Sequence, residues 1–306
     1  MTDFKGRTAV LTGAASGFGL ECARIAAREG MNVVLVDVQA DALVAAQAEI
    51  ELLAAPHGAR VLARSVDVAS ADAMQALADE VAQQFGAPHL VFNNAGVASG
   101  GLVWESTVRD WQWVLGVNLW GVVHGVRLFT PMMLAAAAAD PHWQGHIVNT
   151  ASMAGLLSPP NMGVYNVSKH AVVTLSETLY QDLALVTQQV HAHVLCPFFV
   201  PTGISASQRN RPAGMQDGDA KPTRSQMIGQ AMSEKAVGSG RVSAADVAAK
   251  VFAALRAQQF YIFSHPKALA SVQTRLEDVL QARNPTDPFH DKPELGDQLR
   301  AALRAV

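Results

Sequence analysis

The chain has 306 residues, half of them hydrophobic, which is enough to bury a sizeable core and argues against a disordered chain. A formal charge of -3 gives no field that would gather nucleic acid or an anionic membrane. No apolar run reaches the roughly 18 residues of a membrane span, and the N-terminus does not have the pattern of a signal peptide. We therefore expect a soluble, cytoplasmic protein whose partner is a small molecule.

Seven short runs of apolar, often β-branched residues alternate with longer segments of helical periodicity. They are Thr8–Leu11, Val33–Val36, Val61–Val66, Leu90–Phe92, Ile147–Thr150, Val190–Leu195 and Phe260–Phe263. Strands separated by helices form βαβ crossovers, and nearly continuous apolar strands are covered on both faces. The pattern predicts an α/β fold, a doubly wound Rossmann-type parallel sheet of about seven strands with helices on both faces.

Several helix ends are marked by the residues that usually occupy them. Gly30 follows a helix that begins near Phe18, and Ser70 is placed to cap a helix that runs to about Phe85. Asp140 and Pro141 end a long Ala-rich helix. Further helices are predicted at 225–235, 243–258 and 266–282.

The chain is expected to form a single domain over residues 1–306. Its core would comprise residues 4–202 and 243–264. Residues 203–242 are rich in Gly, Pro, Ser and charge, and we interpret this long insertion as a loop or lid over the substrate. A C-terminal helix and tail would occupy residues 265–306, of which the Pro-spaced segment at 284–293 is predicted to be a surface tail.

The first predicted strand leads into a glycine-rich turn and then a helix. Gly13, Gly17 and Gly19 stand where a backbone must turn tightly and approach a phosphate, and the following helix presents free amide groups to an anion. A glycine-rich turn alone is weak evidence, because loops use glycine for conformational reasons. Its place between the first strand and a helix makes a dinucleotide site the better interpretation.

Asp37 follows the second predicted strand directly. Its carboxylate can accept hydrogen bonds from the adenosine ribose hydroxyls, whereas a 2′-phosphate would meet a like charge. No Lys or Arg stands beside it, because Val38 and Gln39 follow and residues 14–16 contain none. The sequence therefore favours NAD over NADP, although an ordinary turn or capping acid remains the alternative for Asp37.

No metal site is predicted. Cys22 and Cys196 lie in apolar surroundings without a CxxC pattern, and we expect two buried thiols in a reducing compartment. The histidines, among them His146, His191 and His193, lack a ligand spacing and are expected at the surface or in the core.

Tyr165 and Lys169 are four residues apart on one face of a predicted helix, a spacing that by itself is common. Ser152 follows the fifth strand, residues 93–96 read Asn-Asn-Ala-Gly after the fourth, and Asn118 lies in the next helix. With the glycine-rich turn, these motifs resemble the pattern TGxxxGxG, NNAG, Asn, Ser and YxxxK of the short-chain dehydrogenase/reductase family. The resemblance covers residues 4 to about 202.

The resemblance implies a catalytic role for Asn118, Ser152, Tyr165 and Lys169. Tyr165 would exchange a proton with the substrate oxygen, which Ser152 would polarise. Lys169 would bind the nicotinamide ribose and, with the positive nicotinamide, lower the pKa of the Tyr165 phenol from about 10. Asn118 would hold a water against Lys169. The alternatives are a packed Tyr–Lys pair, a turn cap for Ser152 and a helix-interior polar residue for Asn118.

The resemblance also implies a set of cofactor contacts. They are Gly13, Ser16, Gly17, Phe18, Gly19, Asp37, Val38, Asp67, Val68, Asn94, Ala95, Gly96, Tyr165, Lys169, Pro197, Phe198, Val200 and Thr202. Phe198 departs from the family, which usually has glycine there, so its ring would narrow the pocket or stack on an aromatic substrate. A second departure is an insertion at 135–144, interpreted as a surface loop.

The predicted function is hydride transfer between NAD(H) and a secondary alcohol/ketone pair. The substrate is expected to be hydrophobic or aromatic because the residues near the reaction centre are mostly apolar: Met153, Leu157, Met162, Phe198 and Phe199. An NAD-dependent epimerase or dehydratase of the same fold, or a non-catalytic nucleotide-sensing protein, is the alternative.

A homodimer or homotetramer through the helices at 107–134 and 163–187 is implied by the resemblance.

Overall fold

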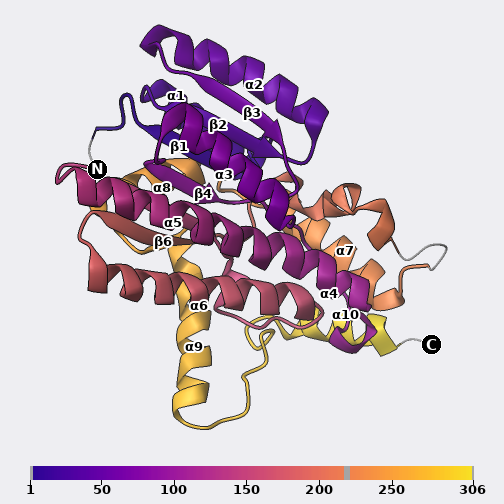
Figure 1. The fold of residues 1–306 in the computed structure, drawn as a ribbon. Coiled ribbons are helices and arrows are strands. Elements are labelled where there is room, and N and C mark those ends of the chain that lie inside the picture. The colour runs from indigo at the N-terminus through magenta and orange to yellow at the C-terminus, as the bar shows by residue number, and fades with distance from the viewer. Residues whose placement is uncertain (1–2, 217–220, 305–306) are drawn as a thin grey trace.

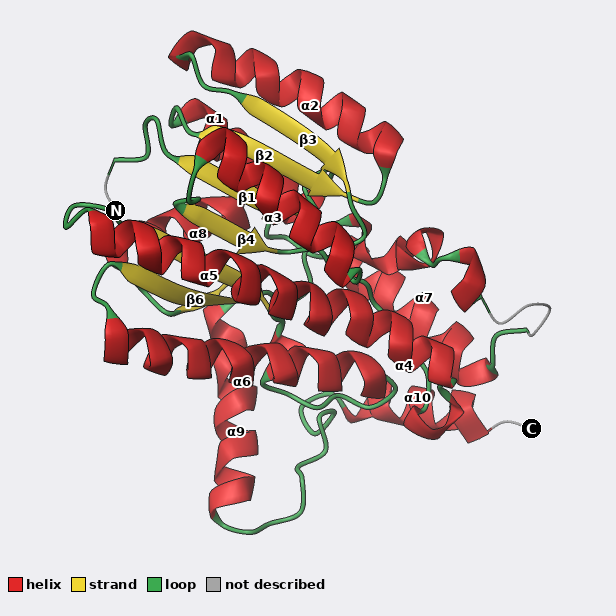
Figure 2. Ribbon diagram, viewed as in Figure 1, coloured by secondary structure: helices red, strands yellow, loops and turns green. Residues whose placement is uncertain are grey.

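The computed structural model describes residues 3–216 and 221–304, which are arranged around one parallel sheet (Figures 1 and 2). The strands are β1 (Thr8–Thr12), β2 (Asn32–Asp37), β3 (Val61–Ser65), β4 (Leu90–Asn93), β5 (Gly145–Thr150), β6 (Val190–Cys196) and β7 (Tyr261–Phe263). Their order is β3-β2-β1-β4-β5-β6-β7. All seven predicted runs are therefore strands, with ends that differ by one or two residues, and the doubly wound parallel sheet is confirmed.

Ten α-helices are found among the described residues. They are α1 (Gly17–Arg28), α2 (Ala40–Ala54), α3 (Ala71–Phe85), α4 (Val108–Leu115), α5 (Gly121–Ala139), α6 (Gly163–Val186), α7 (Arg224–Gly238), α8 (Ala244–Ala257), α9 (Leu269–Leu280) and α10 (Pro293–Arg304). Shorter turns include the π-helical η3 (Gly116–Trp120) and the 3-10 turns η4 (Met153–Gly155) and η5 (Gly203–Asn210).

The two faces of the sheet are covered by different helices. On one face, α1, α2 and α8 bury side chains such as Ile50 and Phe252 against β1 and β2. On the other, α3, α5 and α6 bury Met74, Phe129 and Leu183. Strands enclosed in this way must be apolar on both sides, which explains their nearly continuous hydrophobic sequences.

The strand order reverses between β1 and β4, which run side by side at the centre of the sheet. Crossovers on either side of such a point leave in opposite directions, so a crevice opens beyond the carboxyl ends of the two strands. The glycine-rich turn after β1 and the Asn-Asn-Ala-Gly segment after β4 both lie at this crevice.

One sequence prediction about a surface segment is wrong. Residues 135–139 of the supposed surface loop continue α5, where Ala137 is buried; only residues 140–144 form a loop. The Pro-spaced segment 284–293 is exposed apart from the half-buried Phe289, as predicted for a surface tail, and it leads into α10, which buries Leu299 and contacts α7. Residues 217–220 of the predicted lid lie outside the described residues.

Within the described residues, one helical stretch, Val108–Ala139, is long and apolar enough to span a membrane by length and composition alone. Its most apolar window is 44% buried, and it contributes Val122, Phe129 and Met133 to the core. Packing against the sheet is a sufficient reason for its apolar composition.

Both predicted buried thiols are confirmed. Cys22 and Cys196 are unpaired and almost fully buried, and burial raises the pKa of the Cys196 thiol to about 12. Such thiols are inert at neutral pH.

A pair of histidines is buried between β5 and β6. His146 Nδ1 lies 2.9 Å from His193 Nε2, and His193 Nδ1 lies 2.7 Å from the Gln259 carbonyl. A carbonyl accepts only, so His193 Nδ1 carries the proton and its Nε2 accepts from His146. Burial lowers the pKa of His193 to about 4 and lowers that of His146 further. Their role in packing is therefore confirmed.

This pair predicts that acid destabilises the protein. In the unfolded chain both histidines bind protons below pH of about 6.5, whereas in the folded chain they stay neutral to about pH 4 or lower. Stability is then lost as the pH falls from about 6.5 to about 4, by about 1.4 kcal/mol per pH unit for each histidine. Urea unfolding at pH 7 and pH 5 measures this loss. A His193→Gln variant should show a shallower pH dependence, and the exposed His142→Gln should match the wild type; equal slopes in all three would contradict the assignment.

Candidate active site

A cleft of about 870 Å³ lies over the carboxyl ends of β1, β2, β4 and β5. Its walls come from the loops after these strands, from the start of α6, from the lid segment after β6 and from the C-terminal segment. All the predicted site residues line it except Gly19 and Asn118, which lie behind its wall. The sequence therefore predicted the location of the cleft, and the remaining question is how each side chain is placed.

The glycine-rich turn has the shape that a phosphate cradle needs. Gly13 and Gly17 have φ values of 63° and 55°, in the left-handed region that glycine tolerates best. A Cβ on Gly19 would lie 2.1 Å from the Gly13 carbonyl oxygen, so only glycine lets α1 begin this close to the turn. Ser16 precedes α1 without capping it through its side chain, and it lines the cleft. This cradle fits a pyrophosphate at the start of a helix.

Asp37 ends β2 and is held rigidly in the cleft wall. Its carboxylate accepts hydrogen bonds from the backbone amides of Ala15 and Gln39, each at 3.0 Å, and it is 7% exposed. No basic residue neighbours it in the sequence, as noted above, but Arg209 of η5 donates from Nε to the side chain of Gln39, two residues further on, at 3.1 Å. Sequence reasoning missed this contact because the two residues are 170 positions apart.

The side chain of Thr12 links the end of β1 to the segment that follows β4. Its hydroxyl donates to the Phe92 carbonyl at 3.3 Å and accepts from the amides of Asn94 and Ala95 at 2.9 and 3.0 Å. The Asn94 side chain donates back to the Thr12 carbonyl at 3.0 Å. These bonds tie Asn94 to the end of β1 and so support the centre of the sheet. Thr12 was overlooked, although its place directly before the glycine turn was a signal.

Tyr165 stands in the first turn of α6 with Ser152 opposite, on the loop that ends β5. The Ser152 hydroxyl accepts from the Ala154 amide at 3.1 Å and so caps η4, while it also faces the cleft. The turn cap for Ser152 is therefore confirmed, and its role in polarising a substrate oxygen stays a prediction. Burial raises the pKa of the Tyr165 phenol, and a hydrogen bond with Ser152 offsets part of this rise.

Lys169 lies one turn further along α6 and is 3% exposed. Its ammonium donates to the Thr150 carbonyl at 2.8 Å and lies 5.7 Å from the centroid of the Tyr165 ring. Burial lowers the pKa of Lys169 to about 8. The Tyr165 pKa is thus raised by burial of the phenol, and its predicted lowering by Lys169 together with the positive nicotinamide stays a prediction.

Asn118 lies in η3, where a π-helical turn interrupts the run from α4 to α5. Its side chain accepts from the Val97 amide at 2.8 Å and donates to the Val97 carbonyl and the Ser168 hydroxyl at 2.9 and 3.0 Å. Ser168 in turn donates to the Tyr165 carbonyl at 2.7 Å. Asn118 thus fixes the loop after β4 to the helix that carries Tyr165. Ser168 was missed because serine in a helix interior has no distinctive pattern.

The chain after β6 passes beneath the cleft. The Phe198 amide donates to Ser264 at 2.9 Å, and its ring is 42% exposed and lies 4.6 Å, centroid to centroid, from that of Phe199. Both rings face the cleft, as predicted. Val200 is buried, and Thr202 precedes η5, with its methyl group near Gly17.

The predicted substrate residues divide into two groups. Leu157, Met162 and Phe199 are partly exposed in the cleft. Met153 touches it but is only 1% exposed, and its side chain belongs to the core beneath η4. Core packing is therefore the better interpretation of Met153.

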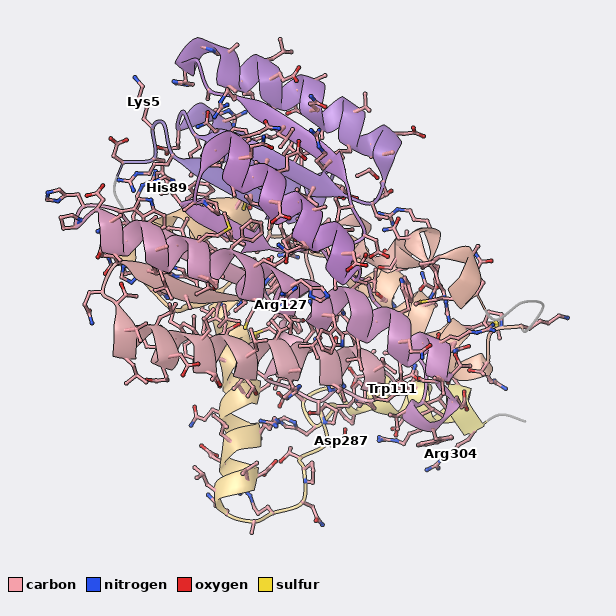
Figure 3. All side chains as sticks on the ribbon, viewed as in Figure 1. Lys5, His89, Trp111, Arg127, Asp287 and Arg304 are labelled. Carbon is pink, nitrogen blue, oxygen red and sulfur yellow. The ribbon has the colours of Figure 1, made fainter. Side chains whose placement is uncertain are left out.

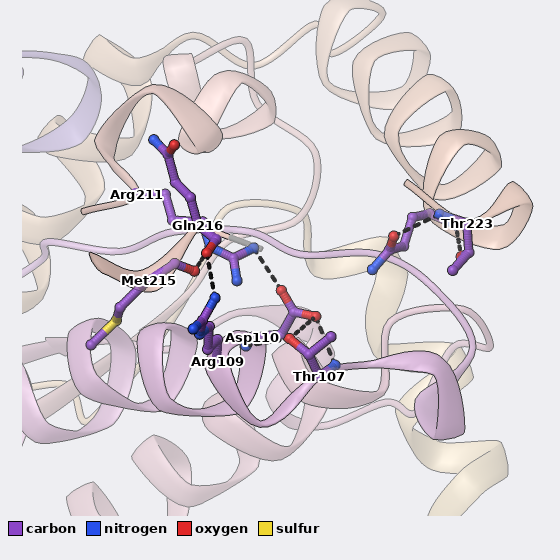
Figure 4. A network of polar contacts seen from close by, with 8 residues as sticks. Thr107, Arg109, Asp110, Arg211, Met215, Gln216 and Thr223 are labelled. Atoms are coloured by element: carbon purple, nitrogen blue, oxygen red, sulfur yellow. Dashed lines mark hydrogen bonds and ion pairs between the residues drawn. The ribbon is translucent and has the colours of Figure 1, made fainter. Parts of the chain in front are cut away.

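The lid segment is fixed to α4 by a buried ion pair (Figure 4). Arg211 and Asp110 are joined by a bond of 2.7 Å between Nη1 and Oδ1, and both side chains are 8% exposed. The Arg211 guanidinium also donates to the Met215 carbonyl at 2.7 Å and lies 5.4 Å from the Trp113 ring centroid. This network holds Met215 in the cleft wall; the sequence did not predict it.

The C-terminal segment supplies the distal wall. α9 projects from the body of the molecule, and the chain then returns past Asp287 to α10 beside the lid (Figures 1 and 3). Residues of α9 and of the returning segment, 271–279 and 283–291, contribute to the lining of the cleft. A possible signal for α10 was Pro293 at its first position followed by Leu295 and Leu299 on one face.

The described residues contain no group of three or more His, Cys, Asp or Glu side chains placed to hold a metal ion. The polar lining of the cleft instead includes the phenol of Tyr165, the ammonium of Lys169, hydroxyls such as that of Ser152, and charged side chains such as Asp37 and Arg275. Such groups bind an organic cofactor and move protons.

Comparison with known proteins agrees with this architecture. The family model of short chain dehydrogenases matches residues 7–213. A solved short-chain dehydrogenase/reductase from Burkholderia phymatum, in complex with NAD, superposes with a TM-score of 0.89 at 49% identity, covering 94% of this chain and 99% of the other. A CLA biosynthesis dehydrogenase/reductase of Lactiplantibacillus plantarum is 32% identical over 92% of this chain and 95% of its own length. A 1-deoxy-11-beta-hydroxypentalenate dehydrogenase of Streptomyces exfoliatus is 34% identical over 89% and 88%.

Proposed function

Because this chain belongs to the short-chain dehydrogenase family, a family of oxidoreductases, we propose that it transfers a hydride between NAD(H) and a secondary alcohol/ketone pair. One observation carries the proposal: Tyr165, Ser152 and Lys169 line the same cleft that holds the glycine turn and Asp37. A dinucleotide lying along that cleft would bring its nicotinamide to the tyrosine.

The residues of the cleft fit such a cofactor. The turn at Gly13 and Gly17 would hold the pyrophosphate, Asp37 the adenosine ribose, and Lys169 the nicotinamide ribose. When bound, the nicotinamide would supply or accept the hydride. Ser152 would donate a hydrogen bond to the substrate oxygen, and Tyr165 would give that oxygen a proton in reduction or take it in oxidation.

The substrate is proposed to be largely apolar around the reacting carbon. Leu157, Met162, Phe199 and Met215 face the cleft near Tyr165, and such a lining favours hydrophobic ketones over sugars. The pentalenate dehydrogenase, by its name, acts on a hydroxy acid, which is consistent with an alcohol on a larger organic body.

A single assay tests the proposal. Purified protein with NADH or NADPH, and with NAD or NADP, is supplied with a panel of aryl, alicyclic, steroid and aliphatic ketones and alcohols, and absorbance of the reduced cofactor is followed. We expect turnover of hydrophobic ketones with NADH. Substrate conversion without net change in absorbance would instead indicate an epimerase or dehydratase, and tight binding of the cofactor without turnover would indicate a nucleotide sensor.

Asp37 is expected to set the preference for NAD. In Asp37→Asn, kcat/KM with NADH should fall by roughly 10- to 100-fold, because charge-assisted hydrogen bonds to the ribose become neutral ones. Use of NADPH should fall less or rise, since the repulsion of its 2′-phosphate is removed. Steady-state kinetics with both cofactors give the ratio of kcat/KM for NADH to kcat/KM for NADPH. The exposed Asp41→Asn of the neighbouring helix is the control. An unchanged NADH/NADPH ratio in Asp37→Asn would assign the carboxylate a purely structural role.

We also propose that the chain forms a cytoplasmic homodimer or homotetramer through α5 and α6. A groove between these helices is lined by Leu119, Val126, Leu175 and Leu179, an apolar surface that a second copy would cover. Light scattering coupled to size-exclusion chromatography measures the mass, and a monomer at micromolar concentration would contradict the proposal.

A further inference from the structure

The distal part of the cleft differs chemically from the part beside Tyr165. On α9, Ser271, Thr274, Arg275 and Asp278 follow the spacing of a single helical face, and all four line the cleft. Near the reacting end the lining is formed by Leu157 and its apolar neighbours. The cleft therefore changes from apolar to polar and charged along its length.

Arg275 is a half-buried cation in this wall without a counter-charge. Within residues 3–216 and 221–304, its side chain makes no hydrogen bond or ion pair. Guanidinium groups that are partly withdrawn from water usually find an anion, because burial makes the unpaired charge unfavourable. The structure thus leaves a cationic binding group facing the cleft.

The nearby carboxylates are already engaged. Asp278, one turn from Arg275, pairs with Arg283 at 3.0 Å and accepts from the Thr286 amide at 2.8 Å. Asp287 pairs with Arg300 at 3.2 Å and accepts from the Phe289 amide. Asp291 contacts His290. None of these acids contacts the guanidinium of Arg275.

The position of α9 places this group within reach of the catalytic end. Val272, at the start of the helix, packs on the cluster that contains Met153 of η4, directly after Ser152, and Leu157 borders the same cluster. Arg275 lies about one helical turn, roughly 5 Å along the axis, beyond Val272. A substrate whose apolar chain lies over Leu157 would therefore reach from the Tyr165 region of the cleft to Arg275.

We infer that Arg275 forms an anion subsite that binds a carboxylate of the substrate, so that the preferred substrate is an oxo- or hydroxy-carboxylic acid with an apolar chain between its two polar groups. The inference deepens the proposed function and rests on it. A planar carboxylate matches the donor fork of one guanidinium, whereas a phosphate dianion would need more positive charge than this acid-rich wall provides.

The experiment compares acids with their neutral esters. Straight-chain oxo-carboxylates of increasing distance between ketone and carboxylate, and their methyl esters, are reduced with NADH by the intact protein. At the optimal length we expect kcat/KM for the acid to exceed that for the ester by roughly 10- to 100-fold, as for a hydrogen-bonded ion pair. In Arg275→Gln this preference should vanish while the ester is reduced as by the wild type, and Arg275→Lys should keep part of it.

The control is Arg256→Gln, which removes the same charge from an exposed arginine that pairs with Glu29 outside the cleft. This variant should keep the wild-type ratio of kcat/KM for the acid to kcat/KM for the ester. A ratio near one in the wild type, or an unchanged ratio in Arg275→Gln, would overturn the subsite while leaving the proposed function standing.

If no ketone is reduced, the proposed function fails, and the subsite is then tested by equilibrium binding. Calorimetric titration of a saturated fatty acid into the NAD-loaded protein should show binding that Arg275→Gln weakens at least tenfold and Arg256→Gln does not. Equal affinity in the three proteins would overturn the subsite.

Discussion

Replacing Tyr165 with phenylalanine should lower kcat for ketone reduction by a factor of about 10² to 10⁴ while the affinity for NADH stays within a few-fold. Phenylalanine keeps the ring in its place on α6 but removes the hydroxyl that would pass a proton to the substrate oxygen. Ser152 alone would still polarise that oxygen, so a small residual rate is expected. Steady-state kinetics give kcat, and the quenching of protein fluorescence gives the affinity for NADH.

The chain offers a matched control on the same helix. Tyr180 also belongs to α6, but it is 43% exposed and packs against Phe260, away from the cleft. Tyr180→Phe should leave kcat within about twofold, so that a loss in Tyr165→Phe alone is chemical. Substantial activity of Tyr165→Phe on any accepted ketone would remove Tyr165 from its proposed role.

The pH dependence of the rates of reduction and oxidation tests the role of Tyr165 independently. Burial raises the pKa of Tyr165, so at neutral pH the phenol is protonated. Reduction needs the protonated form and should be nearly independent of pH around 7, whereas oxidation needs the phenolate and should accelerate as the pH rises. Since burial also lowers the pKa of Lys169 to about 8, binding of the cofactor should weaken above that pH.

The sequence predicted the fold and the residues that line the cleft around Tyr165 because both depend on local patterns. Apolar runs of strand length separated by helices imply a parallel sheet, and the carboxyl ends of parallel strands meet at one edge. The residues after β1, β2, β4 and β5 therefore converge at one edge of the sheet. The i, i+4 spacing of Tyr165 and Lys169 gained meaning only from that convergence.

What the sequence did not predict depends on contacts between distant segments. Arg211 and Asp110 are 101 positions apart, and neither belongs to a motif. The Pro-spaced segment after α9 has the composition of a tail, yet the packing of α10 turns it into a wall of the cleft. The pKa of Tyr165 also could not be inferred from its spacing to Lys169, because burial decides its direction.

The ion pair between Arg211 and Asp110 has the second large expected effect. In Arg211→Met, Asp110 keeps its bonds to the Thr107 amide and hydroxyl but becomes a buried charge without its cation. Breaking one side of such a pair costs about 3–5 kcal/mol. We expect the cost to be avoided by release of the lid segment from α4, which withdraws Met215 from the cleft. KM for the ketone should then rise at least tenfold, while the affinity for NADH changes less.

Two further variants distinguish this mechanism from general damage. Arg109→Met removes the neighbouring arginine, which is exposed and donates to the Gln216 carbonyl at 2.6 Å, and it should change KM by no more than about twofold (Figure 4). Asp110→Asn combined with Arg211→Met removes the unpaired charge and should recover part of the loss, because a neutral amide is less costly to bury than a carboxylate. If Arg211→Met leaves KM unchanged, the lid is held by its other contacts, such as the bond from the Ala98 amide to Ser207, and the ion pair contributes only to stability.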